Sequence, residues 1–281
     1  MLKLEQFNTK TVYIVGGSTG IGLAIAQGFT RLGANVLLFA RRQSVLDSAV
    51  HQCEQVRKDP VQRIEAVSLD ITDPIMTERT MHECVSYFGV PDALINVAGR
   101  AIPNNVEDIS YEQFDATLKI NLYGCRNTIA PLIPYMKIKG GLIVNTSSMV
   151  GLIGVYGYTD YAASKFALIG YSEVLRSELK AYNIQVNVLC PPDTDTPGFA
   201  TENLTKPAAT HAISASANLL TPHQVAEVFF KEIVKDKFLI VPGLNGKFSV
   251  LMKRLFPGLV EFVMDRSIQR AAKAPDYARA R

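Results

Sequence analysis

Short apolar runs alternate with amphipathic segments along most of the chain. The runs predict seven strands, at 11–15, 35–40, 64–69, 93–97, 142–146, 184–189 and 238–241. Because these runs are nearly continuous, they are typical of a sheet that is covered on both faces. Between them, helical spacing of apolar residues predicts helices near 21–32, 43–57, 74–88, 111–137, 160–181 and 222–235. This alternation predicts an α/β fold, with one doubly wound (Rossmann-type) parallel sheet of about seven strands and helices on both faces.

The pattern contains no repeat and no linker that divides the chain. We therefore expect residues 1–281 to form a single domain, for which 281 residues with 48% hydrophobic content supply a sizeable core. Residues 191–221, rich in Pro, Thr, Ala and Asn, form the one long stretch without a regular pattern. A loop of that length in a compact domain is usually functional, so we expect it to be a substrate lid.

The C-terminal part, 245–281, is expected to be an amphipathic extension. Its most apolar portion, 248–264, is interrupted by Lys253, Arg254 and Glu261 and broken by Pro257. A membrane-spanning helix needs about 20 mostly apolar residues, so no span is predicted. Two alternatives stay open. The extension could pack on its own domain or on a subunit partner, or it could be buried shallowly in a membrane surface.

Composition narrows the possible partners and compartment. The net charge of +3 is too small to indicate a nucleic-acid partner. Four scattered cysteines without metal-binding spacing are expected to be buried in a reducing compartment, with no metal site. The first residues contain no apolar run that would form a signal peptide. We expect a cytoplasmic homo-oligomer, with peripheral contact to a membrane surface as the alternative location.

A glycine-rich turn, Gly16-Gly17-Ser18-Thr19-Gly20-Ile21-Gly22, follows the first predicted strand and opens the first helix. Glycines there allow a tight turn and let the backbone approach a pyrophosphate at a helix N-terminus. Two alternatives stay open. The turn could serve only to pack the helix on the strand, or it could be the G-x-S-x-G nucleophile elbow of serine hydrolases. That elbow comes after several strands, however, and it needs an acid and a histidine later in the chain.

The second predicted strand ends at Phe39-Ala40-Arg41-Arg42, where the ribose of a dinucleotide would lie. No carboxylate stands there to bind a 2′-hydroxyl. The guanidinium of Arg41 suits a 2′-phosphate by its charge and its planar donors, which favours NADPH over NADH. The alternative is a pair of solvated surface arginines.

Tyr161 and Lys165 lie four residues apart on one face of a predicted helix. A tyrosine hydroxyl is a poor acid or base at neutral pH, and we expect the Lys165 ammonium to lower its pKa and to bind the nicotinamide ribose. Ser148 follows a predicted strand and could hydrogen-bond a substrate carbonyl oxygen, although the adjacent Ser147 could take that role. Asn121 could anchor a water that connects Lys165 to solvent. These four residues predict transfer of a hydride and a proton.

These motifs together resemble the short-chain dehydrogenase/reductase superfamily. The resemblance runs through about Val241 and includes Asn96-Val97-Ala98-Gly99 and Pro191 to Thr196. It implies that the glycine turn, with Ser18, Thr19 and Ile21, binds the cofactor and that Asp70 binds the adenine amine. It also implies that Asn96 supports the central strand beside the cofactor and that Thr196 contacts the nicotinamide carboxamide.

A narrower resemblance lies in 191–200, continued by Glu202-Asn203 and Lys206-Pro207. This run is similar to the 3-ketodihydrosphingosine reductases, which reduce the ketone of a long-chain amino alcohol with NADPH. It implies reduction of 3-ketosphinganine to sphinganine in sphingolipid synthesis. The alternatives are another lipid-like ketone or 3-oxoacyl group, and a non-catalytic NADP(H)-binding regulator. An alkyl tail would suit the apolar residues near the site, which are Met149, Leu152, Ile153, Val155, Tyr156, Tyr158 and Phe199, and most of them could equally be core.

Overall fold

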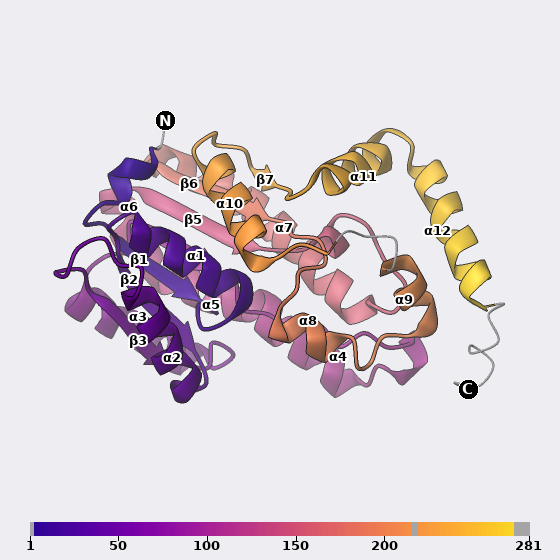
Figure 1. Cartoon of the computed structure of the whole chain (residues 1–281), viewed down its shortest axis with the longest axis horizontal. Helices are drawn as coiled ribbons and strands as arrows, with labels where there is room; N and C mark the ends of the chain where they lie inside the picture. The colour runs from indigo at the N-terminus through magenta and orange to yellow at the C-terminus, as the bar shows by residue number, and fades with distance from the viewer. Residues whose placement is uncertain (1–2, 215–218, 273–281) are drawn as a thin grey trace.

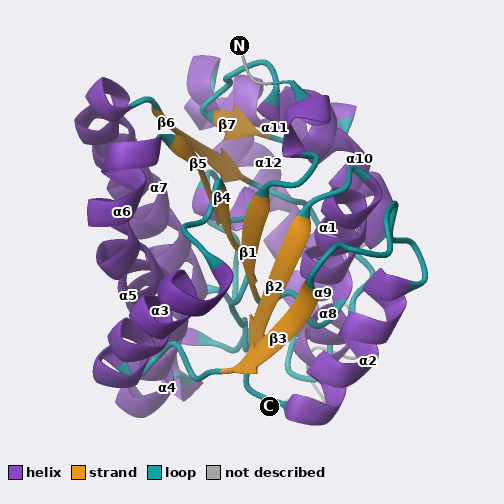
Figure 2. Cartoon of the chain, turned by 90° about the vertical axis from the view of Figure 1, so that its left-hand side faces the viewer, coloured by secondary structure: helices purple, strands orange, loops and turns teal. Residues whose placement is uncertain are grey.

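A single parallel sheet forms the centre of the molecule. The computed structural model describes residues 3–214 and 219–272. The strands are β1 (Thr11–Val15), β2 (Asn35–Ala40), β3 (Ile64–Ser68), β4 (Ala93–Asn96), β5 (Gly141–Thr146), β6 (Ile184–Leu189) and β7 (Leu239–Ile240). Their order is β3-β2-β1-β4-β5-β6-β7, and every neighbouring pair is parallel (Figure 2). The predicted α/β fold with seven strands is confirmed.

Helices cover both faces of this sheet (Figure 2). One layer contains α1 (Gly20–Arg31), α2 (Gln43–Glu54) and α10 (Pro222–Ile233), and the other contains α3 (Pro74–Phe88), α5 (Gly124–Ile129) and α7 (Thr159–Leu179). Alternate residues of β1 point to opposite layers, so Ile14 packs with Phe29 and Phe229, whereas Tyr13 packs with Met81. The core therefore has two apolar layers, one on each side of the sheet, which explains why the strand sequences are largely apolar.

The segment predicted as one helix over 111–137 is interrupted. It consists of α4 (Tyr111–Leu118), a π-helical turn (Lys119–Tyr123), α5, a 3₁₀ turn (Ala130–Leu132) and α6 (Ile133–Lys139). Pro131 and Pro134 lack the amide hydrogen that a continuous helix needs, which accounts for the second interruption. Further 3₁₀ turns lie at Leu4–Phe7, Val106–Asp108, Met149–Gly151 and Lys180–Tyr182.

The stretch 191–221, expected to be irregular, contains two short helices, α8 (Pro197–Glu202) and α9 (Ala208–Ser214). Thr196 caps α8 by accepting a hydrogen bond of 3.0 Å from the amide of Phe199, and Pro197 occupies the first helical position. Thr194 and Leu220 form a parallel bridge near the two ends of the stretch. The expectation of a loop without regular structure was therefore wrong, while the lid role stays a prediction. Residues 215–218 lie outside the described residues.

Two further helices, α11 (Leu244–Leu255) and α12 (Pro257–Ala272), follow β7. Figure 1 shows them in yellow as an arm that reaches around to α9, and α12 contacts both α9 and α11. The helical structure is interrupted at Phe256, next to Pro257, where the sequence predicts a break. Among the described residues, no helix is both long enough and apolar enough to cross a bilayer. Residues 273–281 of the predicted extension lie outside the described residues.

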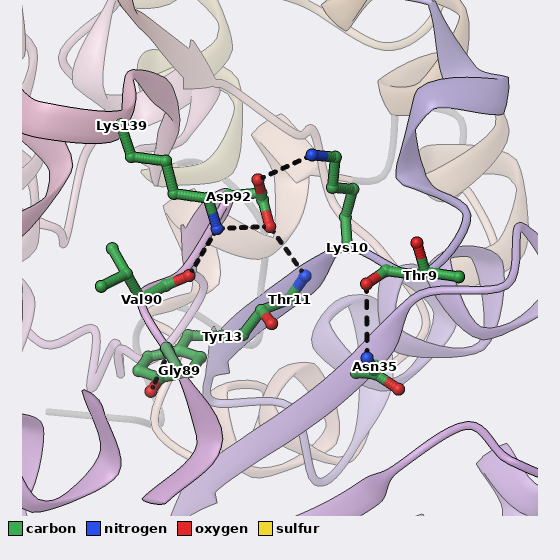
Figure 3. A network of polar contacts seen from close by, with 9 residues as sticks. All are labelled: Thr9, Lys10, Thr11, Tyr13, Asn35, Gly89, Val90, Asp92 and Lys139. Atoms are coloured by element: carbon green, nitrogen blue, oxygen red, sulfur yellow. Dashed lines mark hydrogen bonds and ion pairs between the residues drawn. The ribbon is translucent and has the colours of Figure 1, made fainter. Parts of the chain in front are cut away.

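A polar network fixes the amino-terminal end of β1 (Figure 3). The Asp92 carboxylate accepts a hydrogen bond of 2.9 Å from the amide of Thr11 and pairs with Lys139 at 2.8 Å and Lys10 at 3.5 Å. The Tyr13 hydroxyl donates to the Gly89 carbonyl at 2.8 Å. This network lies at the end of the strand opposite to its carboxyl end, so it contributes to stability away from the glycine turn.

Candidate active site

A cavity of about 290 Å³ lies at the carboxyl ends of β1, β2 and β4. Chain order reverses between β1 and β4, and ligands of doubly wound folds bind at such a switch point. Eight of the residues predicted to bind a cofactor line this cavity, namely Gly16, Ser18, Thr19, Gly20, Ile21, Arg41, Asp70 and Thr196. The topology thus brings together turns that are far apart in the sequence.

Glycines of the turn are packed so closely that a side chain would not fit in their place. Gly16 has a φ of 82°, and a Cβ atom there would lie 2.5 Å from the backbone nitrogen of Ala98. Gly20 has a φ of 54°, and its Cβ would lie 2.8 Å from Cγ2 of Thr196. The Thr19 side chain makes no capping hydrogen bond at the start of α1. The first amides of α1 are therefore open to an anionic group such as a pyrophosphate, and the cavity fits a dinucleotide.

Arg41 and Asp70 form the outer part of the cavity. Both are exposed, and the Ser68 hydroxyl donates to the Arg41 carbonyl at 2.9 Å, which joins the ends of β2 and β3. Partial burial opposes ionisation of Asp70, but hydrogen bonds from Thr72 and the charge of Arg41 outweigh it and lower the pKa of the carboxyl. The described chain therefore places two cations, Arg41 and Arg42, and one anion, Asp70, at this end of the cavity.

Ser148 and Tyr161 lie together after β5. Ser148 accepts a hydrogen bond of 3.2 Å from the amide of Val150, and its side chain lies near enough to Tyr161 to lower the pKa of that hydroxyl. The neighbouring Ser147 is buried and donates to the backbone oxygen of Lys165 at 2.9 Å. Ser148 is thus the serine that can share a substrate oxygen with Tyr161.

Lys165 is buried on α7, and its ammonium donates to the Thr146 carbonyl at 2.8 Å. Asn121, at the centre of the π-helical turn, holds both backbone groups of Arg100, at 2.9 Å and 3.0 Å, and donates to the Ser164 hydroxyl at 3.0 Å. A Cβ on Gly99, which lines the cavity, would lie 3.2 Å from the Lys165 ammonium and 2.8 Å from the Asn121 side-chain oxygen. Lys165 and Asn121 therefore reach the wall of the same cavity.

The sequence profile of the short chain dehydrogenases matches residues 10–207, which include every residue of this site. The chain belongs to the short-chain dehydrogenase family. It is accordingly an oxidoreductase of a family that binds a nicotinamide cofactor.

Three proteins that are similar to this short-chain dehydrogenase are reductases by name. A 3-dehydrosphinganine reductase of Danio rerio is 37% identical over 243 residues, covering 86% of this chain and 73% of the relative. The 3-oxoacyl-[acyl-carrier-protein] reductase FabG of Thermotoga maritima is 33% identical over 78% of this chain and 88% of its own. The structure of L-sorbose reductase from Gluconobacter frateurii, complexed with NADPH and L-sorbose, superposes with a TM-score of 0.71 at 25% identity. That alignment covers 80% of this chain and 90% of the reductase.

The electrostatic expectation for Tyr161 of this short-chain dehydrogenase was wrong in sign. Burial and then the negative charge of Glu202 raise the pKa of the Tyr161 hydroxyl, and the nearby Ser148 side chain only partly opposes them. Burial also lowers the pKa of Lys165 to about 8, because an ammonium is costly to bury. In the described chain, burial is thus the largest cause of both pKa shifts.

Asn96, predicted among the cofactor residues, lies inside the sheet of the short-chain dehydrogenase. Its side chain donates to Asn145 at 3.0 Å and accepts from Thr128 at 2.8 Å, and it is 5% exposed. This placement suits support of the central strand rather than contact with a ligand.

Sequence reasoning missed the residues that position Tyr161. The buried Asp160 accepts from the Tyr161 amide at 2.7 Å and from the Thr117 hydroxyl at 2.7 Å. Ser164 donates to the Tyr161 carbonyl at 2.7 Å while it accepts from Asn121. Acidic residues are common at helix starts, so Asp160 gave no distinct signal in the sequence.

Proposed function

We propose that this protein reduces 3-ketosphinganine to sphinganine with NADPH. The observation that carries the proposal is the pairing of Ser148 with Tyr161 beside the cofactor cavity, with Lys165 one helical turn further along α7. When bound, the reduced nicotinamide supplies the hydride.

The residues of the chain then have separate tasks. The Ser148 and Tyr161 hydroxyls hold the ketone oxygen, and Tyr161 donates the proton that completes the alcohol. The raised pKa of Tyr161 keeps its proton in place at neutral pH, which suits a donor in the direction of reduction. Lys165 and Asn121 lie against the cavity wall at Gly99, and Thr196 is expected to contact the nicotinamide carboxamide.

The cofactor preference rests on Arg41. Its guanidinium lies at the cavity edge where the second strand ends, together with Arg42. A cation at that position favours the additional 2′-phosphate of NADPH. The L-sorbose reductase structure, which contains NADPH, supports the same choice.

The substrate rests on the relatives. The 37% identical protein from Danio rerio is a 3-dehydrosphinganine reductase, and the resemblance over 191–207 supports the same substrate here. The 33% identical FabG makes a 3-oxoacyl thioester the second candidate. NADPH oxidation measured with 3-ketosphinganine, 3-oxoacyl thioesters and steroid ketones discriminates between them. A brisk rate with another ketone and none with 3-ketosphinganine would overturn the assignment.

A Tyr161→Phe variant separates the enzyme from a cofactor-binding regulator. An enzyme should lose turnover but still bind NADPH, because only the proton donor is removed. If reduction of every tested ketone persisted in the variant, Tyr161 would not be the donor.

We also propose that α11 and α12 contact a membrane surface from which the lipid substrate is taken. Large apolar side chains lie exposed along both helices, at Leu244, Phe248, Leu251, Leu255, Phe256, Leu259, Phe262 and Val263. Basic residues exceed acidic ones there, with Arg254, Arg266 and Arg270 among them. Flotation with anionic liposomes should lift the intact chain but not a variant with Phe248, Phe256 and Phe262 changed to Ser. Equal flotation of the two would remove the membrane proposal.

We also propose self-association through the exposed side of α7. Phe166 and Val174 on α7 are 46% and 57% exposed. Apolar side chains that form a contiguous exposed patch mark an interaction site, and we propose that a second subunit covers these two. Sedimentation of the chain and of a Val174→Asp variant would test this, since a homo-oligomer should dissociate in the variant.

A further inference from the structure

A second cavity, of about 340 Å³, lies beside the cofactor cavity. Its lining includes Asp193, Phe199, Asn203, Lys206 and His211. Thr196 and Gly198 line the cofactor cavity, so α8 and the residues before it form a wall between the two. A volume of this size accommodates a small molecule or the head of a lipid.

Asp193, which lines this cavity, lies within electrostatic range of Tyr161. The Tyr158 and Tyr161 rings lie 5.7 Å apart between centroids, and the Tyr158 hydroxyl donates to Glu202. After burial, the negative charges of Glu202 and Asp193 contribute to the raised pKa of Tyr161. Both carboxylates therefore lie close enough to act on whatever Tyr161 binds.

The charges around this cavity are not balanced. Glu202 is satisfied by Tyr158 and by Lys206, whose ammonium lies 3.1 Å from it. Asp193 is half-buried, and its carboxylate has no hydrogen bond or ion pair within the part of the chain that the structure describes. Two carboxylates and one ammonium leave a formal charge of −1, which a monocationic ligand would neutralise.

Lys206 supplies an independent sign of a ligand. Its side chain is 0% exposed, and its ammonium lies 4.0 Å from the centroid of the Phe199 ring. Glu202 can take at most one of its three donors, and among the described residues the buried ammonium finds no well-directed hydrogen bond. A buried ammonium with unused donors needs an oxygen acceptor, and Lys206 belongs to the lining of this cavity.

We propose that this cavity recognises an amino alcohol next to the ketone, with Asp193 binding a protonated amine and Lys206 binding a hydroxyl oxygen. The inference rests on the proposed function and deepens it, because it names the chemical class of the group attached to the reacting carbonyl. The ketone oxygen lies at Ser148 and Tyr161, and the α-carbon, which is bonded to the carbonyl carbon, carries the amine toward Asp193. Asp193 and Lys206 are thus specificity-determining residues, since neither takes part in proton transfer.

The test compares three long-chain substrates, which are 3-ketosphinganine, its deamino analogue with the same hydroxyl and ketone, and its 1-deoxy analogue. Each is assayed by NADPH oxidation with the intact chain and with Asp193→Asn, using Asp195→Asn as the matched control. Asp195 is exposed two residues away and does not line either cavity.

Asp193→Asn should lower kcat/KM for 3-ketosphinganine about 10- to 100-fold, mainly through KM, because a charge-assisted hydrogen bond is lost. It should leave kcat/KM for the deamino analogue within about threefold, and Asp195→Asn should change neither. Equal losses on both substrates, or no loss on either, would overturn the role of Asp193.

Lys206 is tested by substrate rather than by mutation alone, because its ion pair with Glu202 is buried and Lys206→Met could unfold α8. The intact chain should reduce the 1-deoxy analogue about tenfold less efficiently than 3-ketosphinganine. A folded Lys206→Met should reduce 3-ketosphinganine and the 1-deoxy analogue with equal efficiency. Equal efficiency in the intact chain would overturn the role of Lys206.

If the intact chain reduces the deamino analogue with the same efficiency as 3-ketosphinganine, this inference fails while the proposed function stands. If it reduces none of the three, the proposed function fails and the inference falls with it.

Discussion

The buried hydroxyl of Ser147 donates a hydrogen bond of 2.9 Å to the backbone oxygen of Lys165. This contact ties the end of β5 to α7 and leaves Ser148 to face Tyr161. We predict that Ser148→Ala lowers kcat about 10²- to 10³-fold with little change in the free energy of unfolding, because a donor to the substrate oxygen is lost.

The matched variant is Ser147→Ala. It should cost roughly 1 kcal/mol of unfolding free energy, since it removes one buried hydrogen bond, and should retain most of kcat. Steady-state kinetics and urea unfolding of both variants check the pair. A larger loss of kcat in Ser147→Ala than in Ser148→Ala would reverse the assignment.

Arg41 can be tested through the cofactor preference. Arg41→Glu should raise the KM for NADPH at least tenfold more than the KM for NADH, because a carboxylate repels the 2′-phosphate. Arg57→Glu makes the same charge change at an exposed residue outside the cavity and should leave the ratio unchanged. An unaltered preference in Arg41→Glu would mean that Arg41 is only a surface residue.

Lys165 gives a prediction about pH. Burial lowers its pKa to about 8, so the ammonium loses its proton as pH rises through that value. If the cation helps to bind the anionic cofactor, the Kd for NADPH should be flat below pH 8 and rise up to tenfold per pH unit above it. Fluorescence titration of NADPH from pH 6.5 to 9.5 measures this. Lys165→Met should bind weakly, and its Kd should not change in that window; an identical pH profile in both proteins would exclude Lys165 as the titrating group.

Asp92 is the residue in Figure 3 whose loss should affect stability alone. Asp92→Ala removes the acceptor of the Thr11 amide and leaves Lys10 and Lys139 without their carboxylate. We expect a loss of about 1–3 kcal/mol of unfolding free energy, with KM unchanged. Asp47→Ala on the exposed side of α2 should cost clearly less. A changed KM in Asp92→Ala would show that the network reaches the active site.

Apolar patterning was sufficient for the sheet, since β1, β2 and β6 begin and end where the sequence predicts. Residues that depend on contacts between distant segments could not be predicted in this way. The π-helical turn at Asn121 is set by its hydrogen bonds to Arg100 and Ser164, and no local signal marks it. The pKa of Tyr161 depends on burial and on Glu202, which is 41 positions later in the chain (202 − 161). Spacing in the sequence predicts that Tyr161 and Lys165 lie on one helical face, but the effect of burial on their pKa values depends on the folded structure.

Gly99 tests whether the close packing around Lys165 and Asn121 matters for catalysis. A Cβ there would lie 2.8 Å from the Asn121 side-chain oxygen and 3.2 Å from the Lys165 ammonium. Gly99→Ala should therefore displace one or both side chains and lower kcat/KM about tenfold or more, because small displacements in an active site are costly. Gly154→Ala is the control, since a Cβ at Gly154 would meet no atom within 4 Å. If both alanine variants keep normal kinetics and the same NADPH affinity, Lys165 and Asn121 do not need their observed positions, and the proposed arrangement of the active site would be wrong.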